Sequence, residues 1–274
     1  MADLSNFNSG YVDSEGAKIY FESAGNGPAL VFIQAGVADC RMWDPQFETF
    51  AKKFRVVRYD HRGFGKSKMP EGPYALRRDL HSVLVHLGVE KAALVGCSMG
   101  GATAIDYTIE HPERVSALVP VGSGVSGWNE WTDDAIRYFT EFMKLAKNRE
   151  VDRAREMDAQ LWIDGTREAA NVDPKYRERA RELHRDNFSL DRFAHPEQEM
   201  KPPAAGRLGE IKCPTMVLIG DSDTPELVRL ADRIAKEIPG ARHVTIKNAA
   251  HLPSLEHPEE FDQQLADFLG PILR

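Results

Sequence analysis

The chain has 274 residues, of which 42% are hydrophobic and 28% are charged, a balance typical of a globular protein with a substantial apolar core. Its 35 basic and 42 acidic residues give a formal net charge of −7. This charge argues against a nucleic-acid partner, which requires a basic face. No run of about 18 apolar residues occurs, so the sequence predicts no membrane span and no membrane partner.

The N-terminal sequence and the cysteines together favour a cytoplasmic location. The chain begins MADLSNFNSG, which has neither the cationic nor the apolar segment of a secretory signal peptide. The three cysteines, Cys40, Cys97 and Cys213, form no CxxC motif and predict neither a disulfide framework nor a thiolate zinc site. HExxH and GxGxxG motifs are also missing, so we expect no metal ion and no cofactor.

Short apolar runs alternate with helical patterns along the chain. Leucines at positions 76, 80, 84 and 87 predict a helix that ends before Gly88, and a similar pattern from Leu227 to Ile238 ends before Pro239. Several of the apolar runs lack polar positions, which is typical of strands in a parallel sheet covered on both faces. The pattern predicts an α/β fold. The expected strands are Lys18–Glu22, Ala29–Ile33, Arg55–Tyr59, Ala92–Gly96, Ala117–Val121, Thr215–Ile219 and His243–Ile246.

One segment, residues 127–206, contains no strand candidate and is helical and heavily charged. It carries Trp128, Trp131 and Trp162, which we take as candidate substrate-binding residues. Two interpretations stay open: a helical core of its own, or a lid whose apolar underside closes over a site. We therefore expect a core domain made of residues 1–126 and 207–274, with residues 127–206 as a helical cap.

The strongest motif is Gly-x-Ser-x-Gly at residues 96–100, between a predicted strand and a predicted helix. A strand-to-helix turn this tight leaves no room for side chains at Gly96 and Gly100, and it exposes the hydroxyl of Ser98 above the sheet. Met99 then lies at the start of the helix, where free backbone N–H groups favour an anion. The motif predicts that Ser98 is a nucleophile.

A serine nucleophile needs a base, and the base needs an acid to orient it. Asp223 follows the strand Thr215–Ile219 and precedes Thr224-Pro225, which are typical of a helix start. The alternative acid, Asp221, lies nearer the strand and is better explained by a turn. His251 follows the last predicted strand by a short loop, so the chain order Ser98, Asp223, His251 predicts a catalytic triad.

The sequences GCSMGG, GDSDTP and NAAHLPSLEHPEEF resemble those of the α/β-hydrolase fold superfamily. The resemblance covers nearly the whole chain except residues 127–206, which lie where that family places its cap. It implies a mostly parallel central sheet flanked by helices, with an all-helical cap inserted after the sixth core strand. The segment Tyr59–Ser67 is similar to the loop after the fourth strand of the family, where its role is structural. The branch of small esterases, enol-lactonases and cofactor-free haloperoxidase (perhydrolase)-like hydrolases is the nearest.

One loop departs from the family pattern. The family usually has His-Gly after the strand that corresponds to Ala29–Ile33, and this chain has Gln34-Ala35-Gly36. The resemblance implies that the backbone N–H groups of Gly36 and Met99 form the oxyanion hole. A backbone donor survives a change of side chain, and Gln34 can hydrogen-bond across the loop as a histidine would.

We expect a serine hydrolase that cleaves a small-molecule carboxylic ester or lactone through an acyl-enzyme intermediate. In this reaction Ser98 attacks the carbonyl carbon of the substrate, His251 is the base and Asp223 orients the base. Three alternatives fit the same residues: hydrolysis of a C–C bond in a β-diketone, peracid formation, and a small-ligand receptor without catalysis. The sequence identifies neither the substrate nor the oligomeric state.

Overall fold

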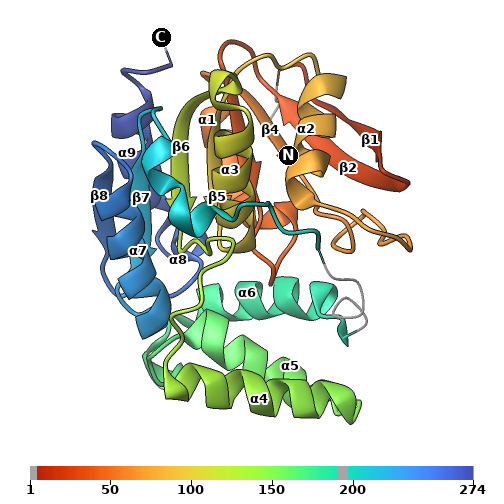
Figure 1. The fold of residues 1–274 in the computed structure, drawn as a ribbon, viewed down its shortest axis with the longest axis vertical. Helices are drawn as coiled ribbons and strands as arrows, with labels where there is room; N and C mark the ends of the chain where they lie inside the picture. The colour runs from red at the N-terminus through yellow and green to blue at the C-terminus, as the bar shows by residue number, and fades with distance from the viewer. Residues whose placement is uncertain (1–4, 191–196, 274) are drawn as a thin grey trace.

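A twisted, eight-stranded sheet forms the centre of the computed structural model, which describes residues 5–190 and 197–273 (Figure 1). The spatial order of the strands is β1-β2-β4-β3-β5-β6-β7-β8. The pairs β1–β2 and β2–β4 are antiparallel, and all other neighbours are parallel, so the predicted mostly parallel sheet is confirmed. The strands are β1 (Asn8–Ser14), β2 (Ala17–Ala24), β3 (Ala29–Ile33), β4 (Arg55–Tyr59), β5 (Ala92–Cys97), β6 (Val115–Val121), β7 (Met216–Gly220) and β8 (Arg242–Ile246).

The central strands are buried on both faces, as their continuous apolar sequences predict. Every residue of β3, β5 and β7 is buried. The sequence did not predict β1, because Asn8–Ser14 is largely polar and half-exposed at the sheet edge. Its strand conformation comes from antiparallel pairing with β2 along its whole length.

Helices cover both faces of the sheet, and two apolar clusters show which helix covers which face. One cluster contains Phe47 of α1 and Phe261 of α9; the other contains Leu80 of α2, Ile105 of α3 and Leu230 of α7. The sheet therefore lies between α1 and α9 on one side and α2, α3 and α7 on the other. The helices around the sheet are α1 (Asp44–Phe50), α2 (Leu76–His86), α3 (Met99–Glu110), α7 (Pro225–Glu237), α8 (Pro253–Glu256) and α9 (Pro258–Leu269).

The segment between β6 and β7 forms a separate helical layer beside the sheet (Figure 1), which we call the helical insert. It has a small apolar cluster of its own around Phe142, Leu145 and Ala154, while Leu183 and Ala180 of α6 join the cluster of the sheet. The insert therefore packs partly on itself and partly against the sheet. Its helices are α4 (Asp133–Lys147), α5 (Val151–Ala159), a π-helical turn (Gln160–Asp164) and α6 (Pro174–Asn187). No helix in the described part of the chain has the length and apolar character needed to cross a bilayer.

Candidate active site

Ser98 occupies a strained turn between β5 and α3. Its backbone has φ 55° and ψ −114°, a conformation that residues with a Cβ rarely adopt. A Cβ on Gly96 would lie 2.2 Å from the carbonyl oxygen of Gly100, and a Cβ on Gly100 would lie 2.5 Å from that of Ile33. Only glycines fit on both sides of the serine. The preceding residue, Cys97, is fully buried and its thiol donates a hydrogen bond to the carbonyl of His251 at 3.3 Å.

Asp223 and His251 meet because β7 and β8 are parallel neighbours, so the loops that follow them leave the same edge of the sheet. The Oδ2 atom of Asp223 lies 2.8 Å from Nδ1 of His251, and the two side chains are 0% and 1% exposed. The second carboxylate oxygen of Asp223 accepts a hydrogen bond from the backbone N–H of Thr224 at 2.7 Å. This geometry holds the proton on Nδ1 and leaves Nε2 of a neutral ring as the acceptor.

The alternative acid has a different position. The Oδ1 atom of Asp221 accepts the backbone N–H of Asn248 at 2.7 Å, so its carboxylate closes the turn between the two loops. Glu256 supports the loop of His251 on its other side, because its Oε2 atom accepts the N–H of Ala250 at 2.9 Å. Arg167 of the helical insert pairs with the same glutamate at 2.7 Å.

Gly122, which the sequence analysis did not single out, borders the Asp223–His251 pair. It follows β6 directly and has φ +48°. A Cβ at this position would lie 3.0 Å from Oδ2 of Asp223 and 3.3 Å from Nδ1 of His251. The missing side chain therefore leaves room for the hydrogen bond between those two residues. A glycine directly after a predicted strand is the sequence signal that could have pointed to it.

A cavity of about 280 Å³ opens above Ser98, between the sheet and the helical insert. Ser98 and His251 both line it, together with Gly36 and Met99. The remaining lining is mostly apolar and comes from both layers: Val37, Phe64, Phe139, Phe142, Met143, Asp158, Trp162, His184, Asn187, Phe188 and Ser189. The structure thus brings the predicted nucleophile, base and oxyanion loop to the lining of one cavity, which we call the catalytic cavity.

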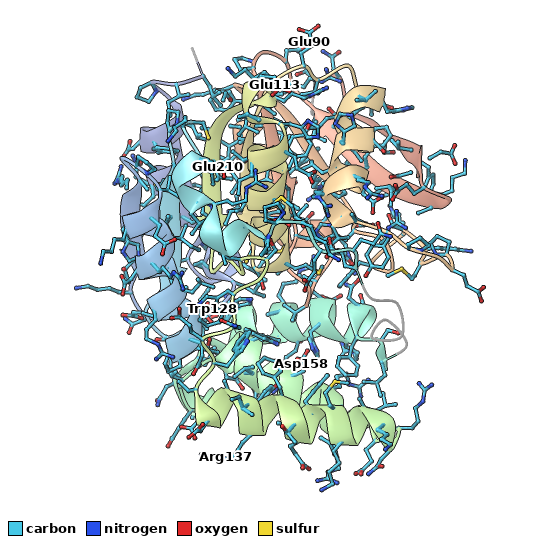
Figure 2. The ribbon with its side chains drawn as sticks, viewed as in Figure 1. Glu90, Glu113, Trp128, Arg137, Asp158 and Glu210 are labelled. Carbon is cyan, nitrogen blue, oxygen red and sulfur yellow. The ribbon has the colours of Figure 1, made fainter. Side chains whose placement is uncertain are left out.

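The three tryptophans of the insert have different positions. Trp162 lines the catalytic cavity, and its ring centroid lies 4.5 Å from that of His251. Trp128 and Trp131 pack against each other at 4.6 Å and are not among the residues that line this cavity (Figure 2 labels Trp128). Trp131 is 41% exposed and lines a second cavity of about 510 Å³, which shares Trp162 and Phe139 with the first.

The loop that carries Gly36 is held from inside by Gln34, which is fully buried. Its Nε2 atom donates to the carbonyl of Ala38 at 2.7 Å, and its Oε1 atom accepts the N–H of His61 at 3.3 Å. The expectation that this glutamine bonds across the loop is confirmed. A Cβ on Gly36 would lie 3.6 Å from Sδ and Cε of Met99, so the two residues form one wall beside Ser98.

A second histidine–carboxylate pair lies in the catalytic cavity. Nε2 of His184 is 2.8 Å from Oδ2 of Asp158, and Oδ1 of Asp158 accepts the indole N–H of Trp162 at 2.9 Å. Among the histidines the sequence analysis singled out only His251, so it missed His184. The two residues are 26 positions apart on different helices, so no sequence motif joins them.

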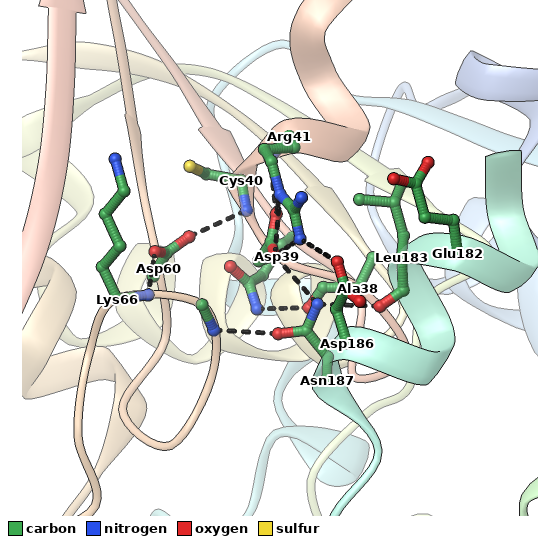
Figure 3. A network of polar contacts seen from close by, with 12 residues as sticks. Ala38, Asp39, Cys40, Arg41, Asp60, Lys66, Glu182, Leu183, Asp186 and Asn187 are labelled. Carbon is green, nitrogen blue, oxygen red and sulfur yellow. Dashed lines mark hydrogen bonds and ion pairs between the residues drawn. The ribbon is translucent and has the colours of Figure 1, made fainter.

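A network of polar contacts joins α6 to the loops that follow β3 and β4 (Figure 3). Nδ2 of Asn187 donates to Asp39 at 2.9 Å, and Oδ1 of Asn187 accepts the N–H of Gly65 at 2.8 Å. Arg41 bridges Asp39 and Asp186 at 2.7 and 2.9 Å. Burial raises the pKa of the Asp39 carboxyl, but the hydrogen bonds from Arg41 and Asn187 outweigh burial and hold that pKa below its usual range. The network fixes the insert over the cavity.

Asp39, Cys40 and Asp60 in the same region have potential metal-ligand atoms within 4.8 Å of one another. The carboxylates already accept protein hydrogen bonds: Asp39 from Arg41 and Asn187, and Asp60 from the N–H groups of Cys40 and Lys66. Burial also raises the pKa of Asp60 above its ordinary value. We assign these residues to the network that holds the insert.

Comparison with known proteins identifies the family of the chain. The model of a protein family described as the alpha/beta hydrolase fold matches residues 28–258. A 2-hydroxy-6-oxononadienedioate/2-hydroxy-6-oxononatrienedioate hydrolase of Paraburkholderia phymatum is 32% identical over 92% of this chain and 91% of its own. The carboxylesterase YbfK of Bacillus subtilis is 25% identical over 94% of this chain and 86% of its own.

Among solved structures, a thermophilic esterase from Thermogutta terrifontis superposes with a TM-score of 0.77 at 22% identity, covering 98% of this chain and 100% of its own. This likeness shows a shared fold. The family match covers most of the chain and includes the elbow of Ser98, the loop of Asp223 and the loop of His251. The chain therefore belongs to the alpha/beta hydrolase fold family, whose relatives named above are hydrolases and esterases.

Proposed function

We propose that this protein is a serine hydrolase that cleaves a small carboxylic ester or lactone through an acyl-enzyme intermediate. The observation that carries the proposal is the buried 2.8 Å contact between Asp223 and His251, beside a cavity that His251 shares with the strained Ser98. We also infer that residues 127–206 act as a cap over a core made of residues 1–126 and 207–274.

The chemistry follows from the positions of the side chains. His251 removes the proton of Ser98 as the hydroxyl attacks the carbonyl carbon, and Asp223 stabilises the imidazolium that forms. The N–H groups of Gly36 and Met99 hold the negative oxygen of the tetrahedral intermediate. His251 then protonates the leaving alcohol, and water repeats the sequence to release the acid.

Trp162 is the best supported substrate contact among the three tryptophans, because it lines the catalytic cavity and its ring centroid lies 4.5 Å from that of His251. Trp128 and Trp131 line no part of the catalytic cavity. Trp131 lines the second cavity, so it would contact only a longer ligand that reaches there, and Trp128 lines neither cavity.

The test is covalent labelling of the nucleophile. Wild-type protein incubated with a fluorophosphonate should gain the mass of one adduct, and Ser98→Ala should gain none. Ser189→Ala, which removes another serine hydroxyl from the lining of the same cavity, should still be labelled. On p-nitrophenyl esters, Ser98→Ala should lower kcat by about 10⁴-fold or more. Labelling of Ser98→Ala, or turnover by it at the wild-type rate, would disprove the role of Ser98.

Hydrolysis of a C–C bond is the second candidate, because the 32% identical relative is named for a keto-dioate substrate. Such a substrate carries two carboxylates and a ketone in place of the ester. The same residues could serve both reactions, so the labelling experiment does not separate them. Turnover of a simple uncharged ester, at a rate that Ser98→Ala abolishes, favours the ester reaction.

A further inference from the structure

The catalytic cavity has one strongly polar wall, contributed by the helical insert. Asp158 is the only carboxylate among the described residues that line the cavity, and none of these lining residues is a lysine or an arginine. The neighbouring polar residue Asn187 already donates to Asp39 and accepts from Gly65. Asp158 is therefore the group most able to select among substrates by charge. Figure 2 labels it inside the insert, close to α6.

Asp158 is oriented by two partners on different elements. Trp162, in the π-helical turn, donates its indole N–H to Oδ1, and His184 of α6 lies at hydrogen-bond distance from Oδ2. The carboxylate side chain is 18% exposed and His184 is 2% exposed, so the pair is fixed within the insert yet open to the cavity. Each carboxylate oxygen can accept two hydrogen bonds, so each retains room for one more donor.

We propose that Asp158 determines specificity, so that the enzyme favours substrates whose far end is an uncharged hydrogen-bond donor and disfavours substrates that end in a carboxylate. This inference rests on the proposed function. An O–H or N–H group of the substrate can donate a hydrogen bond to a lone pair of the Asp158 carboxylate. This bond replaces the one that the substrate group loses when it leaves water. A substrate carboxylate would instead lie near a negative charge in a cavity whose lining is mostly apolar.

Neither protonation state of His184 favours a substrate carboxylate. With a neutral imidazole the pair carries one negative charge, which repels an anion. With an imidazolium the pair is neutral overall, and the positive charge is already matched by Asp158 at 2.8 Å. In neither state do these two residues supply a net positive charge for a substrate carboxylate.

Three esters of equal length test the proposal: p-nitrophenyl hexanoate, p-nitrophenyl 6-hydroxyhexanoate and the mono-p-nitrophenyl ester of hexanedioic acid. They end in a methyl, a hydroxyl and a carboxylate, and kcat/KM is measured for each at pH 8 from nitrophenolate release. For wild-type protein we expect the carboxylate ester to be at least about tenfold poorer than the methyl ester. The hydroxyl ester should be at least as good as the methyl ester.

Asp158→Asn is the decisive variant, because it removes the charge and keeps an oxygen that can accept the indole N–H of Trp162. It should raise the ratio of kcat/KM for the carboxylate ester over the methyl ester by about fivefold or more. Asp152→Asn is the matched control: it removes one carboxylate from the same helix, but its side chain is 89% exposed and does not line the cavity. The control should keep the wild-type ratio.

The outcomes separate this inference from the proposed function. Turnover of the methyl ester that Ser98→Ala abolishes upholds the proposed function, whatever the role of Asp158. The inference is then overturned if wild-type protein uses the carboxylate ester within twofold of the methyl ester, or if Asp158→Asn and Asp152→Asn give equal ratios. If Asp158→Asn does not fold, the inference is judged from the wild-type ratio of kcat/KM for the carboxylate ester over the methyl ester. No turnover of any ester and no fluorophosphonate adduct would overturn both proposals.

Discussion

A substitution at Gly122 tests the geometry of the site without replacing a catalytic side chain. Its φ of +48° lies in the left-handed region, where an alanine costs about 1–2 kcal/mol more than glycine. In Gly122→Ala the new Cβ would also lie 3.0 Å from Asp223 Oδ2 and 3.3 Å from His251 Nδ1, closer than ordinary contact. The pair must shift by a few tenths of an ångström, and we expect kcat/KM to fall by at least about tenfold.

Gly88→Ala supplies the matched control. Gly88 has φ +63°, and a Cβ built there would have no atom within 4 Å, so this variant carries the backbone cost alone. Both variants should lower Tm by a few degrees, as measured by differential scanning fluorimetry. Only Gly122→Ala should also lose activity on p-nitrophenyl esters. If Gly122→Ala keeps wild-type kcat/KM while losing the same stability as Gly88→Ala, then the Asp223–His251 contact does not limit catalysis in the way proposed.

Two further predictions concern buried polar groups. Burial raises the pKa of Asp106 from 3.8 to about 6, which corresponds to about 3 kcal/mol. Stability is therefore lost as pH rises from about 4 to 6, and Asp106→Asn should raise Tm over wild type by more at pH 7.5 than at pH 4; an equal Tm difference at both pH values would contradict this. Gln34→Ala leaves the Ala38 carbonyl and the His61 N–H without their bonds to Gln34, and should slow fluorophosphonate labelling by about tenfold or more. An unchanged labelling rate would show that this loop does not position the oxyanion donors.

Much of the site could be predicted from the sequence because its parts are local. The elbow is indicated by a five-residue motif, and a Cβ on Gly96 would meet the backbone of Gly100 and Gly101 within the same turn. The choice of Asp223 over Asp221 followed from the helix start at Thr224, whose side chain caps α7 in the structure. Continuous apolar runs likewise identified the buried strands, since a parallel sheet covered on both faces leaves no polar positions.

The tertiary structure decided the features that depend on contacts between distant segments. The strand β1 exists through its pairing with β2, because its own sequence is too polar to indicate a buried strand. The three tryptophans look alike in the sequence, and only the packing of the insert places Trp162 on His251 and the other two away from the catalytic cavity. The Asp158–His184 pair joins two helices whose relative position depends on how the insert packs on the sheet. A sequence determines local backbone geometry through nearby residues, whereas the shape and charge of the cavity arise where separate layers meet.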